Sequence, residues 1–296
     1  MRLIILILAL FILLSANAEG RNAGRCPITK IEEQRLDQLH MVLKCYVSED
    51  GTEHRGWWVF LKTTHATNGV LVFVPANLPS GPTNVVVYFH GYKDGPATVD
   101  KYHLVESALE TGLPAITVLP VGLISQAAND WGDVIRAGGL KRLLTDVVKQ
   151  LFNHAYGEGQ LVKSPEIGHI AVIAHSGGSN AAEVSIMRGG VEVDYLGLCD
   201  ALYGDQIKPL LRGETGFQKW VAANPEHQLR GGHTRGYAKL FARLKGHLPQ
   251  TEQVAIVPAK TPNHNELVGE MLPGWFKEFG VAWTAPHGQL VATAEK

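Results

Sequence analysis

The sequence predicts an α/β fold, in which a mostly parallel, twisted sheet of about eight strands has helices on both faces. Strand-like and helix-like runs alternate along the chain from Gly56 onward. Several strand-like runs, such as residues 85–89 and 115–120, are almost entirely apolar. Such runs are typical of strands covered on both faces. A small turn at residues 174–178 separates an apolar run from a helical one, as expected where a parallel strand leads into its crossover helix.

The expected elements follow in order. Strands are predicted at residues 57–62, 70–75, 85–89, 115–120, 169–174, 195–200 and 253–258, with a weaker candidate at 227–231. The first two are rich in β-branched and aromatic residues, and we expect them to pair antiparallel. Helices are predicted at 137–154, 179–188 and 237–244 from apolar residues at three- and four-residue spacing. Gly246 is placed to end the last of these helices.

One segment, residues 206–224, is a candidate for a cap over the site, although it is short. Its apolar residues Phe217, Trp220 and Val221 form either a one-helix lid or a crossover helix that packs on the sheet. We favour the crossover helix.

The start of the chain resembles a cleaved secretory signal. Arg2 precedes a continuous apolar run, residues 3–14, which leads to Ala16-Asn17-Ala18. A basic start, a short apolar core and an A-x-A ending predict cleavage after Ala18. The run is shorter than the roughly twenty residues of a membrane span, and no later segment qualifies. We expect residues 1–18 to be removed and the mature protein to be secreted or periplasmic, with no membrane span.

The rest of the chain is expected to form an N-terminal segment, residues 19–55, and one large α/β domain, residues 56–296. The formal net charge is −1 and no basic run stands out, so nothing indicates a nucleic-acid partner. Cys26 and Cys45 either pair across the N-terminal segment or remain unpaired, and Cys199 reads as a buried small side chain. The sequence does not indicate an oligomeric state.

The turn at residues 174–178, AHSGG, predicts a catalytic nucleophile. A serine on a sharp strand-to-helix turn exposes its Oγ at the carboxyl edge of the sheet. The residues two before and two after it must be small, because larger side chains would collide across the turn. Ala174 and Gly178 meet this requirement. We therefore predict Ser176 as the nucleophile; an ordinary turn in a glycine-rich chain is the alternative.

An attacking serine needs a base, and the base needs a carboxylate that orients it. After such a turn these are expected in the chain order acid, then histidine. Asp200 closes an apolar strand at the same edge as Ser176 and is the predicted acid, unless it only caps the following turn. Asp205 remains an alternative acid, whereas Asp194 lies at the wrong end of the strand.

His264 is the predicted base, because it lies in a loop after the last convincing strand. His233 follows a doubtful strand and His287 lies in the tail, so both are weaker rivals.

The loop after the strand at residues 85–89 is predicted to help form an oxyanion hole. Its backbone N–H of Tyr92 or Gly91, together with that of Gly177, would face the developing negative charge. His90 is expected to orient this loop, or to be a half-buried histidine at a strand end. His175 is expected to pack or hydrogen-bond beneath the nucleophile.

Trp131, in the loop of residues 122–133, either walls a substrate pocket beside His90 or plugs the core. The chain has no H-E-x-x-H and no paired C-x-x-C, so a catalytic metal is not expected. It also has no G-x-G-x-x-G after the first strand and no Walker sequence, so no cofactor is expected.

With Phe89-His90-Gly91, the AHSGG turn, Asp200 and His264 in this order, the chain resembles the α/β-hydrolase superfamily, of the esterase/lipase type, over residues 56–283. The resemblance implies an eight-stranded sheet and acyl transfer through an acyl-enzyme. Three features depart from the usual pattern. Ala174 replaces a glycine, the oxyanion loop is not a run of glycines, and Asp200 lies one strand earlier than is commonest.

The expected function is an exported serine hydrolase that cleaves carboxylic esters, small or lipid-like, without a cofactor. An amidase or peptidase that acts on peptide or cell-wall fragments with the same triad remains open, because the same histidine can protonate an amine leaving group. A non-catalytic binding protein on a hydrolase scaffold is the third alternative, since one fold can host many functions.

Overall fold

The computed structural model describes residues 41–47, 53–76, 82–91, 94, 101–113, 115–122, 131–156, 166–202 and 207–284. Within these ranges, nine strands form one sheet in the order β1-β2-β3-β5-β4-β6-β7-β8-β9. The strands are β1 Met41–Val47, β2 Glu53–Leu61, β3 Val70–Pro75, β4 Thr83–Phe89, β5 Ala115–Pro120, β6 Ile167–His175, β7 Tyr195–Cys199, β8 Gln228–His233 and β9 Val254–Pro258.

The sheet changes from antiparallel to parallel along its width. β1, β2 and β3 pair antiparallel, and β3 also pairs antiparallel with β5. All the following pairs, from β5–β4 to β8–β9, are parallel. The predicted fold class is therefore confirmed. The strand that the sequence did not predict is β1, which extends the sheet to Met41, on the N-terminal side of residue 56.

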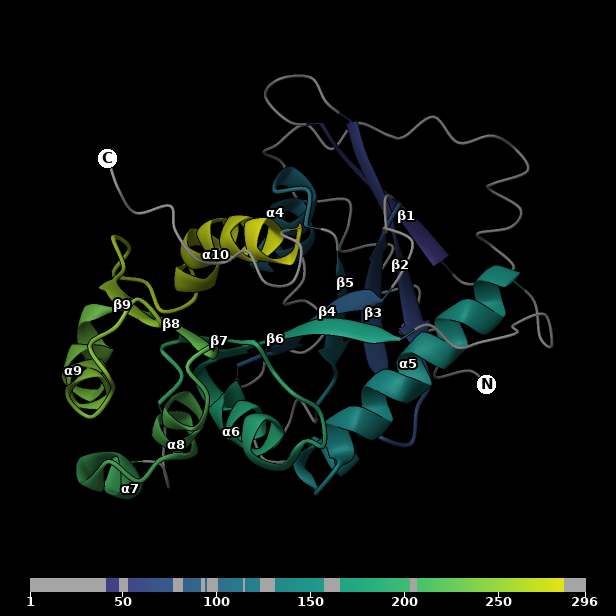
Figure 1. Cartoon of the computed structure of the whole chain (residues 1–296). Coiled ribbons are helices and arrows are strands. Elements are labelled where there is room, and N and C mark those ends of the chain that lie inside the picture. Colours follow the sequence, from purple (N-terminus) through teal and green to yellow (C-terminus); the bar gives the residue numbers. More distant parts are fainter. Residues whose placement is uncertain are drawn as a thin grey trace.

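Helices cover both faces of the sheet, as Figure 1 shows. Those in the described residues are α4 Leu104–Glu110, α5 Gly139–Tyr156, α6 Ser179–Arg188, α7 Ile207–Arg212, α8 Gly216–Ala223, α9 Ala238–Gly246 and α10 Leu267–Thr284. One core cluster joins the sheet to α5, α6, α7, α8 and α9, and a second joins the opposite face to α4 and α10.

The alternation of side chains along β4 explains the two cores. Val85, Val87 and Phe89 belong to one cluster, while Val86 and Tyr88 belong to the other. All five side chains are fully buried. Successive strand residues point to opposite faces, so a strand with both faces covered must be apolar throughout. This is the pattern that predicted the strand.

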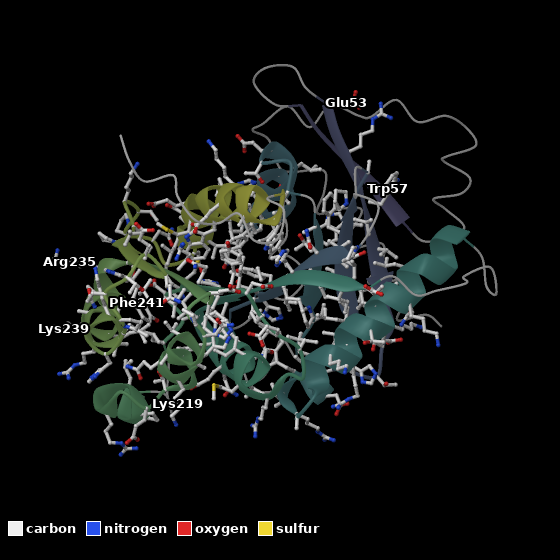
Figure 2. The ribbon with its side chains drawn as sticks, in the orientation of Figure 1. Glu53, Trp57, Lys219, Arg235, Lys239 and Phe241 are labelled. Atoms are coloured by element: carbon white, nitrogen blue, oxygen red, sulfur yellow. The ribbon has the colours of Figure 1, made fainter. Side chains whose placement is uncertain are left out.

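The structure favours the crossover interpretation of the segment at residues 206–224. Phe217, Trp220 and Val221 of α8 are buried in the core beside the sheet. α9 is likewise amphipathic: Phe241 is fully buried, and Lys239 of the same helix is exposed (Figure 2). Both helices therefore pack as crossovers against one face.

Several predictions fall on residues outside the described ranges. These are the secretory signal, Cys26, Tyr92, Asp205 and His287. Cys199 is a free, fully buried cysteine, and burial raises the pKa of its thiol well above the ordinary value. Among the described helices, none has the length and apolar character needed to span a membrane.

Candidate active site

Ser176 lies at a sharp turn between β6 and α6. The turn, Ser176–Gly178, is a single 3₁₀ turn whose three residues are all buried. Ser176 has a φ of 49°, in the left-handed region that residues other than glycine rarely adopt. Such a strained serine between a strand and a helix is the geometry of a nucleophile held at the edge of a sheet.

His264 and Asp200 lie in direct contact, although 64 residues separate them in the chain. The His264 Nδ1 is 2.8 Å from Asp200 Oδ2, and Asp200 is fully buried. A carboxylate oxygen accepts, so the ring nitrogen that faces it carries the proton. In the neutral ring the lone pair is then on Nε2, which is the tautomer that a general base requires.

Thr234 holds the Asp200 side chain from the other side. Its backbone N–H donates to Asp200 Oδ1 at 2.8 Å, and its hydroxyl donates to Oδ2 at 2.8 Å. These contacts compensate for the burial of a carboxylate, which is costly without partners. Asp200 also has a positive φ, 45°, and lies in a bend immediately after β7.

Strand register brings the predicted residues to one edge of the sheet. His175 pairs with Cys199 across β6 and β7, so Ser176 and Asp200 are the next residues of neighbouring parallel strands. His264 follows β9 at the same edge, and its ring centroid is 4.6 Å from that of His175. The ring of the predicted base therefore lies against the residue that precedes the predicted nucleophile.

The His90–Gly91 segment also lies against the nucleophile turn. A Cβ placed on Gly91 would lie 3.2 Å from Ser176 Cβ, 2.9 Å from His175 Nδ1 and 2.8 Å from Asp94 Oδ2. A side chain at this position would force the Asp94 or His175 side chain to move. The Gly91 backbone is therefore close to Ser176, and Gly177, the other predicted oxyanion donor, is buried immediately after the serine. Tyr92, the other predicted donor on this loop, is outside the described residues.

His90 is buried, and both of its ring nitrogens contact backbone atoms of the neighbouring loops. Its Nδ1 lies 2.8 Å from the Gly91 carbonyl, and the Gly122 N–H donates to Nε2 at 3.3 Å. The Trp131 ring packs beside it, tilted at 4.7 Å from the His90 ring and edge-on at 5.2 Å from the Phe89 ring. Trp131 is only 2% exposed, which favours its core interpretation over a wall of an open pocket. His90 likewise acts as a loop-orienting residue.

Of the rival residues, the structure describes His233 and Asp194, and both lie elsewhere. The ring of His233 stacks on Phe241 of α9 at 5.3 Å, and its Nδ1 is near the Thr234 carbonyl. Asp194 is at the start of β7, where its Oδ2 accepts from the Ile170 N–H at 2.8 Å. Neither is placed to assist Ser176.

The loop that carries His264 is held by two carboxylates, Glu266 and Glu270. Glu270 accepts from the backbone N–H groups of Lys260 and Thr261 at 2.8 and 2.9 Å. Glu266 accepts from the Asn263 side chain at 2.8 Å. Tyr237 then stacks on His264, with 5.5 Å between the ring centroids and 14° between the planes. Thr234 and Tyr237 belong to no sequence motif. They reach the site only because the chain folds back to it.

Acid is expected to destabilise the protein in the histidine range. Burial lowers the pKa of His90 and of His175 below the ordinary 6.5. Below about pH 6.5 the unfolded chain therefore binds more protons than the folded one, and stability falls as the pH is lowered toward the folded-state pKa values. Above that pH this contribution is constant. The limiting slope is about 1.4 kcal/mol per pH unit for each histidine.

Denaturant unfolding between pH 8 and pH 5 measures this slope. Asp94 titrates in a separate, more acidic range, because its contacts with His175, Lys101 and Tyr102 outweigh burial and lower the pKa of its carboxyl group well below the ordinary 3.8. Its contribution is therefore lost only under more acidic conditions. A free energy of unfolding that does not change between pH 6.5 and pH 5 would contradict the assignment of two buried neutral histidines.

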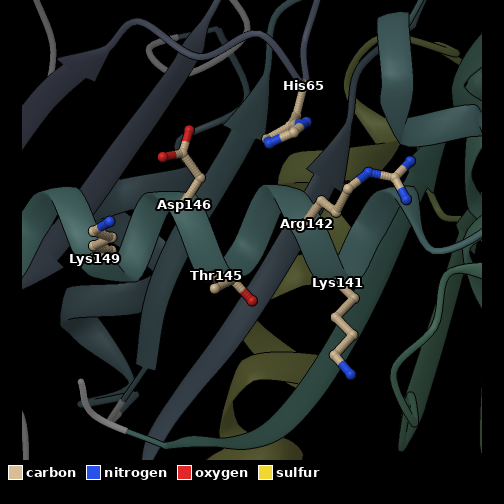
Figure 3. Close-up of a pocket in the computed structure, with 6 residues that line it drawn as sticks. All are labelled: His65, Lys141, Arg142, Thr145, Asp146 and Lys149. Atoms are coloured by element: carbon tan, nitrogen blue, oxygen red, sulfur yellow. The ribbon is translucent and has the colours of Figure 1, made fainter. Parts of the chain in front are cut away.

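A separate hollow of about 330 Å³ lies on the outer face of α5. Figure 3 shows its lining residues, which are His65, Lys141, Arg142, Thr145, Asp146 and Lys149. His65 Nδ1 and Arg142 Nε are 3.3 and 3.1 Å from Asp133 Oδ2, so these contacts tie α5 to the loop before β3. The hollow shares no residue with the site at Ser176. No group of three potential metal ligands occurs among the described residues.

No protein-family model and no curated protein matches this chain. Among solved structures, the chain is similar to a mutant of the feruloyl esterase module from Clostridium thermocellum complexed with sinapinate, at 14% identity and a TM-score of 0.47, over 81% of this chain and 86% of that chain. It is similar to an S-formylglutathione hydrolase from Agrobacterium tumefaciens, at 12% identity and a TM-score of 0.43, over 81% and 95% of the two chains. A dienelactone hydrolase from Anabaena variabilis is similar at 14% identity and a TM-score of 0.43, over 75% and 98%. The likeness is one of fold, to α/β-hydrolase esterases at low sequence identity.

Proposed function

We propose that this protein is an exported serine hydrolase that cleaves carboxylic esters, with Ser176 as nucleophile, His264 as base and Asp200 as the acid that orients it. One observation carries the proposal. The His264 ring and the buried Asp200 carboxylate are 2.8 Å apart at the sheet edge where Ser176 holds a left-handed turn. A serine, a histidine and a carboxylate in this relation are the parts of a nucleophilic triad.

The proposed reaction has two halves. Ser176 Oγ attacks the ester carbonyl while its proton passes to His264 Nε2, and the resulting oxyanion accepts hydrogen bonds from the N–H groups of Gly177 and of Gly91 or Tyr92. The tetrahedral intermediate collapses, the acyl–oxygen bond breaks, and the leaving alcohol takes the proton from His264. Water then attacks the acyl-enzyme by the same route and releases the carboxylic acid. Each oxyanion donor is worth roughly 3–4 kcal/mol to such a reaction.

Esters are preferred over amides on chemical grounds. An alkoxide leaves with less help than an amine, and amide cleavage depends more strongly on proton donation from the histidine. The substrate class is therefore taken as small or lipid-like esters.

A covalent probe tests the nucleophile. We expect a fluorophosphonate to label the mature protein in a 1:1 ratio and Ser176→Ala to remove the labelling, because the probe reacts only with an activated serine. Ser179→Ala is the matched control, since Ser179 begins α6 beyond the turn and should remain fully labelled. Labelling that persists in Ser176→Ala would exclude Ser176 as the nucleophile.

Turnover distinguishes the remaining functions. The purified protein is expected to hydrolyse p-nitrophenyl esters faster than matched p-nitroanilides. Hydrolysis of the anilides alone would favour an amidase, and a folded protein with neither turnover nor labelling would favour a binding protein. Export is tested separately by the N-terminal sequence of the released protein, which should begin at Glu19.

A further inference from the structure

His175 occupies a central position beneath the candidate site. Its side chain is 1% exposed, and its Nε2 lies 3.2 Å from the backbone carbonyl oxygen of His264. Its Nδ1 faces Asp94 Oδ2 at 3.5 Å, and Tyr102 packs edge-on against the ring at 5.1 Å. One buried imidazole thus connects the nucleophile turn, the oxyanion loop and the loop that carries the predicted base.

The contacts assign the tautomer of this ring. Both groups that face the ring, the His264 carbonyl and the Asp94 carboxylate, can only accept a hydrogen bond. The contact at Nε2 is 3.2 Å and within hydrogen-bond geometry, whereas the contact at Nδ1 is 3.5 Å and is not, so the proton of the neutral His175 is placed on Nε2. The lone pair of Nδ1 then points at an acceptor, Asp94 Oδ2. That explains why their separation is long and why Nδ1 has no hydrogen-bond partner despite its burial.

The surroundings of Asp94 favour this tautomer. The Tyr102 hydroxyl donates to Asp94 Oδ2 at 2.8 Å, and the Lys101 ammonium donates to Oδ1 at 2.8 Å. Both carboxylate oxygens therefore already have donors, and neither requires a proton from His175. The ring is left to donate in the other direction, toward His264.

We infer that His175 is a positioning residue, whose Nε2–H holds the backbone carbonyl of His264 and so fixes the predicted base beside the nucleophile turn. The inference rests on the proposed function. Glu266 and Glu270 hold the flanks of the same loop, but the His175 contact is the one made by the residue next to Ser176. An error of about 1 Å in the placement of a catalytic group can lower a rate roughly 10²-fold.

Two amide variants separate this role from packing. In His175→Gln the amide nitrogen can reach the position of Nε2 and donate to the His264 carbonyl. In His175→Asn the shorter amide reaches only the position of Nδ1, beside Asp94. We expect His175→Gln to keep kcat within about threefold of the wild type and His175→Asn to lower it roughly 10- to 100-fold, with KM changed far less.

The control is His169→Gln. His169 lies on the same strand as His175 but at its other end, where its ring stacks on Trp283. This variant should leave kcat unchanged. Melting temperatures of all variants separate a loss of fold from a loss of rate. Equal kcat in the Gln and Asn variants, or an active Asn variant beside an inactive Gln variant, would overturn the inference.

Nitrogen NMR gives a reading that does not depend on activity. In ¹⁵N-histidine-labelled protein, the signal that disappears in His175→Gln should show the Nε2–H tautomer in the wild type. Tyr102→Phe removes a donor to Asp94 and should shift that signal toward Nδ1–H. An Nδ1–H tautomer in the wild type would refute the inference. If labelling and turnover fail while the Nε2–H tautomer is found, the proposed function fails and the His175 contact stands.

Discussion

Asp200→Asn is expected to lower kcat sharply, approaching roughly 10⁴-fold, while KM changes far less. The rate falls because the new amide can place an N–H donor, rather than an acceptor, opposite the ring of His264. The effect should appear in steady-state hydrolysis of a p-nitrophenyl ester at neutral pH. The variant should also remain folded, because the amide has the same shape as the carboxyl group and keeps most of its hydrogen bonds.

Thr234 determines the orientation of that amide. Its backbone N–H donates to Oδ1 in the wild type, so the amide oxygen must stay there, because a donor facing a buried donor costs about 1–3 kcal/mol. The amide NH₂ is therefore directed at His264 Nδ1. To avoid a second clash of donors, the ring must move its proton to Nε2. A ring with its proton on Nε2 cannot take the proton of Ser176.

The same substitution at other positions provides the controls. Asp194→Asn changes the carboxylate at the opposite end of β7 and should leave kcat within about twofold. Asp205→Asn tests the alternative acid directly and should be nearly silent. A crippled Asp205→Asn beside an active Asp200→Asn would assign the acid to Asp205 and reduce the role of Asp200 to that of a turn cap.

The central strands could be predicted because a strand that is buried on both faces appears in the sequence as a continuous apolar run. β3 and β5 have the bounds that their apolar runs predict, and α6 begins and ends where its pattern does. Strands at the edge of the sheet and irregular helices have weaker sequence patterns. α10 contains Pro273 and several glycines, which oppose a helical prediction, yet it is buried against the sheet. Tertiary packing outweighs propensity there.

The short helix α4 was missed for a related reason. It begins after His103, which has a positive φ and no side-chain cap, so the usual start signal is absent. β1 has a strand-like composition but lies on the N-terminal side of the clear alternation of strands and helices, and it is stabilised by its pairing with β2. α4 therefore lacks a local start signal, whereas β1 has a local signal but lies outside the region where the alternation is clear.

The candidate site divides in the same way. Ser176, Asp200 and His264 follow strands, and strand ends can be predicted, so their approach to one edge could be expected. Thr234, Tyr237 and the His175–Asp94 contact could not, because their partners lie far away in sequence and no residue pattern marks the pairing. Sequence therefore predicted the candidate reacting groups, and the structure shows which residues contact them.

Gly178→Ala is expected to disturb the nucleophile turn itself. A Cβ on Gly178 would overlap the carbonyl oxygen of Phe89 and lie 2.8 Å from its carbonyl carbon and 2.9 Å from its Cβ. These are main-chain and Cβ atoms at the end of a buried central strand, so no flexible side chain can move aside. The turn must shift away from β4, and overpacking of this kind costs about 1–3 kcal/mol.

That shift also moves the backbone N–H of Gly177, the predicted oxyanion donor. We expect kcat to fall roughly 10²-fold, as for other displacements of about 1 Å, together with a lower melting temperature. Gly274→Ala is the matched control. An added Cβ there meets no atom within 4 Å on the exposed side of α10, so it should raise the free energy of unfolding by roughly 0.5–1 kcal/mol and leave kcat unchanged. If Gly178→Ala kept wild-type kcat and stability, the close contact between the turn and β4 would not be what positions Ser176. The left-handed φ at Ser176 would then have to be maintained by β6 and α6 alone.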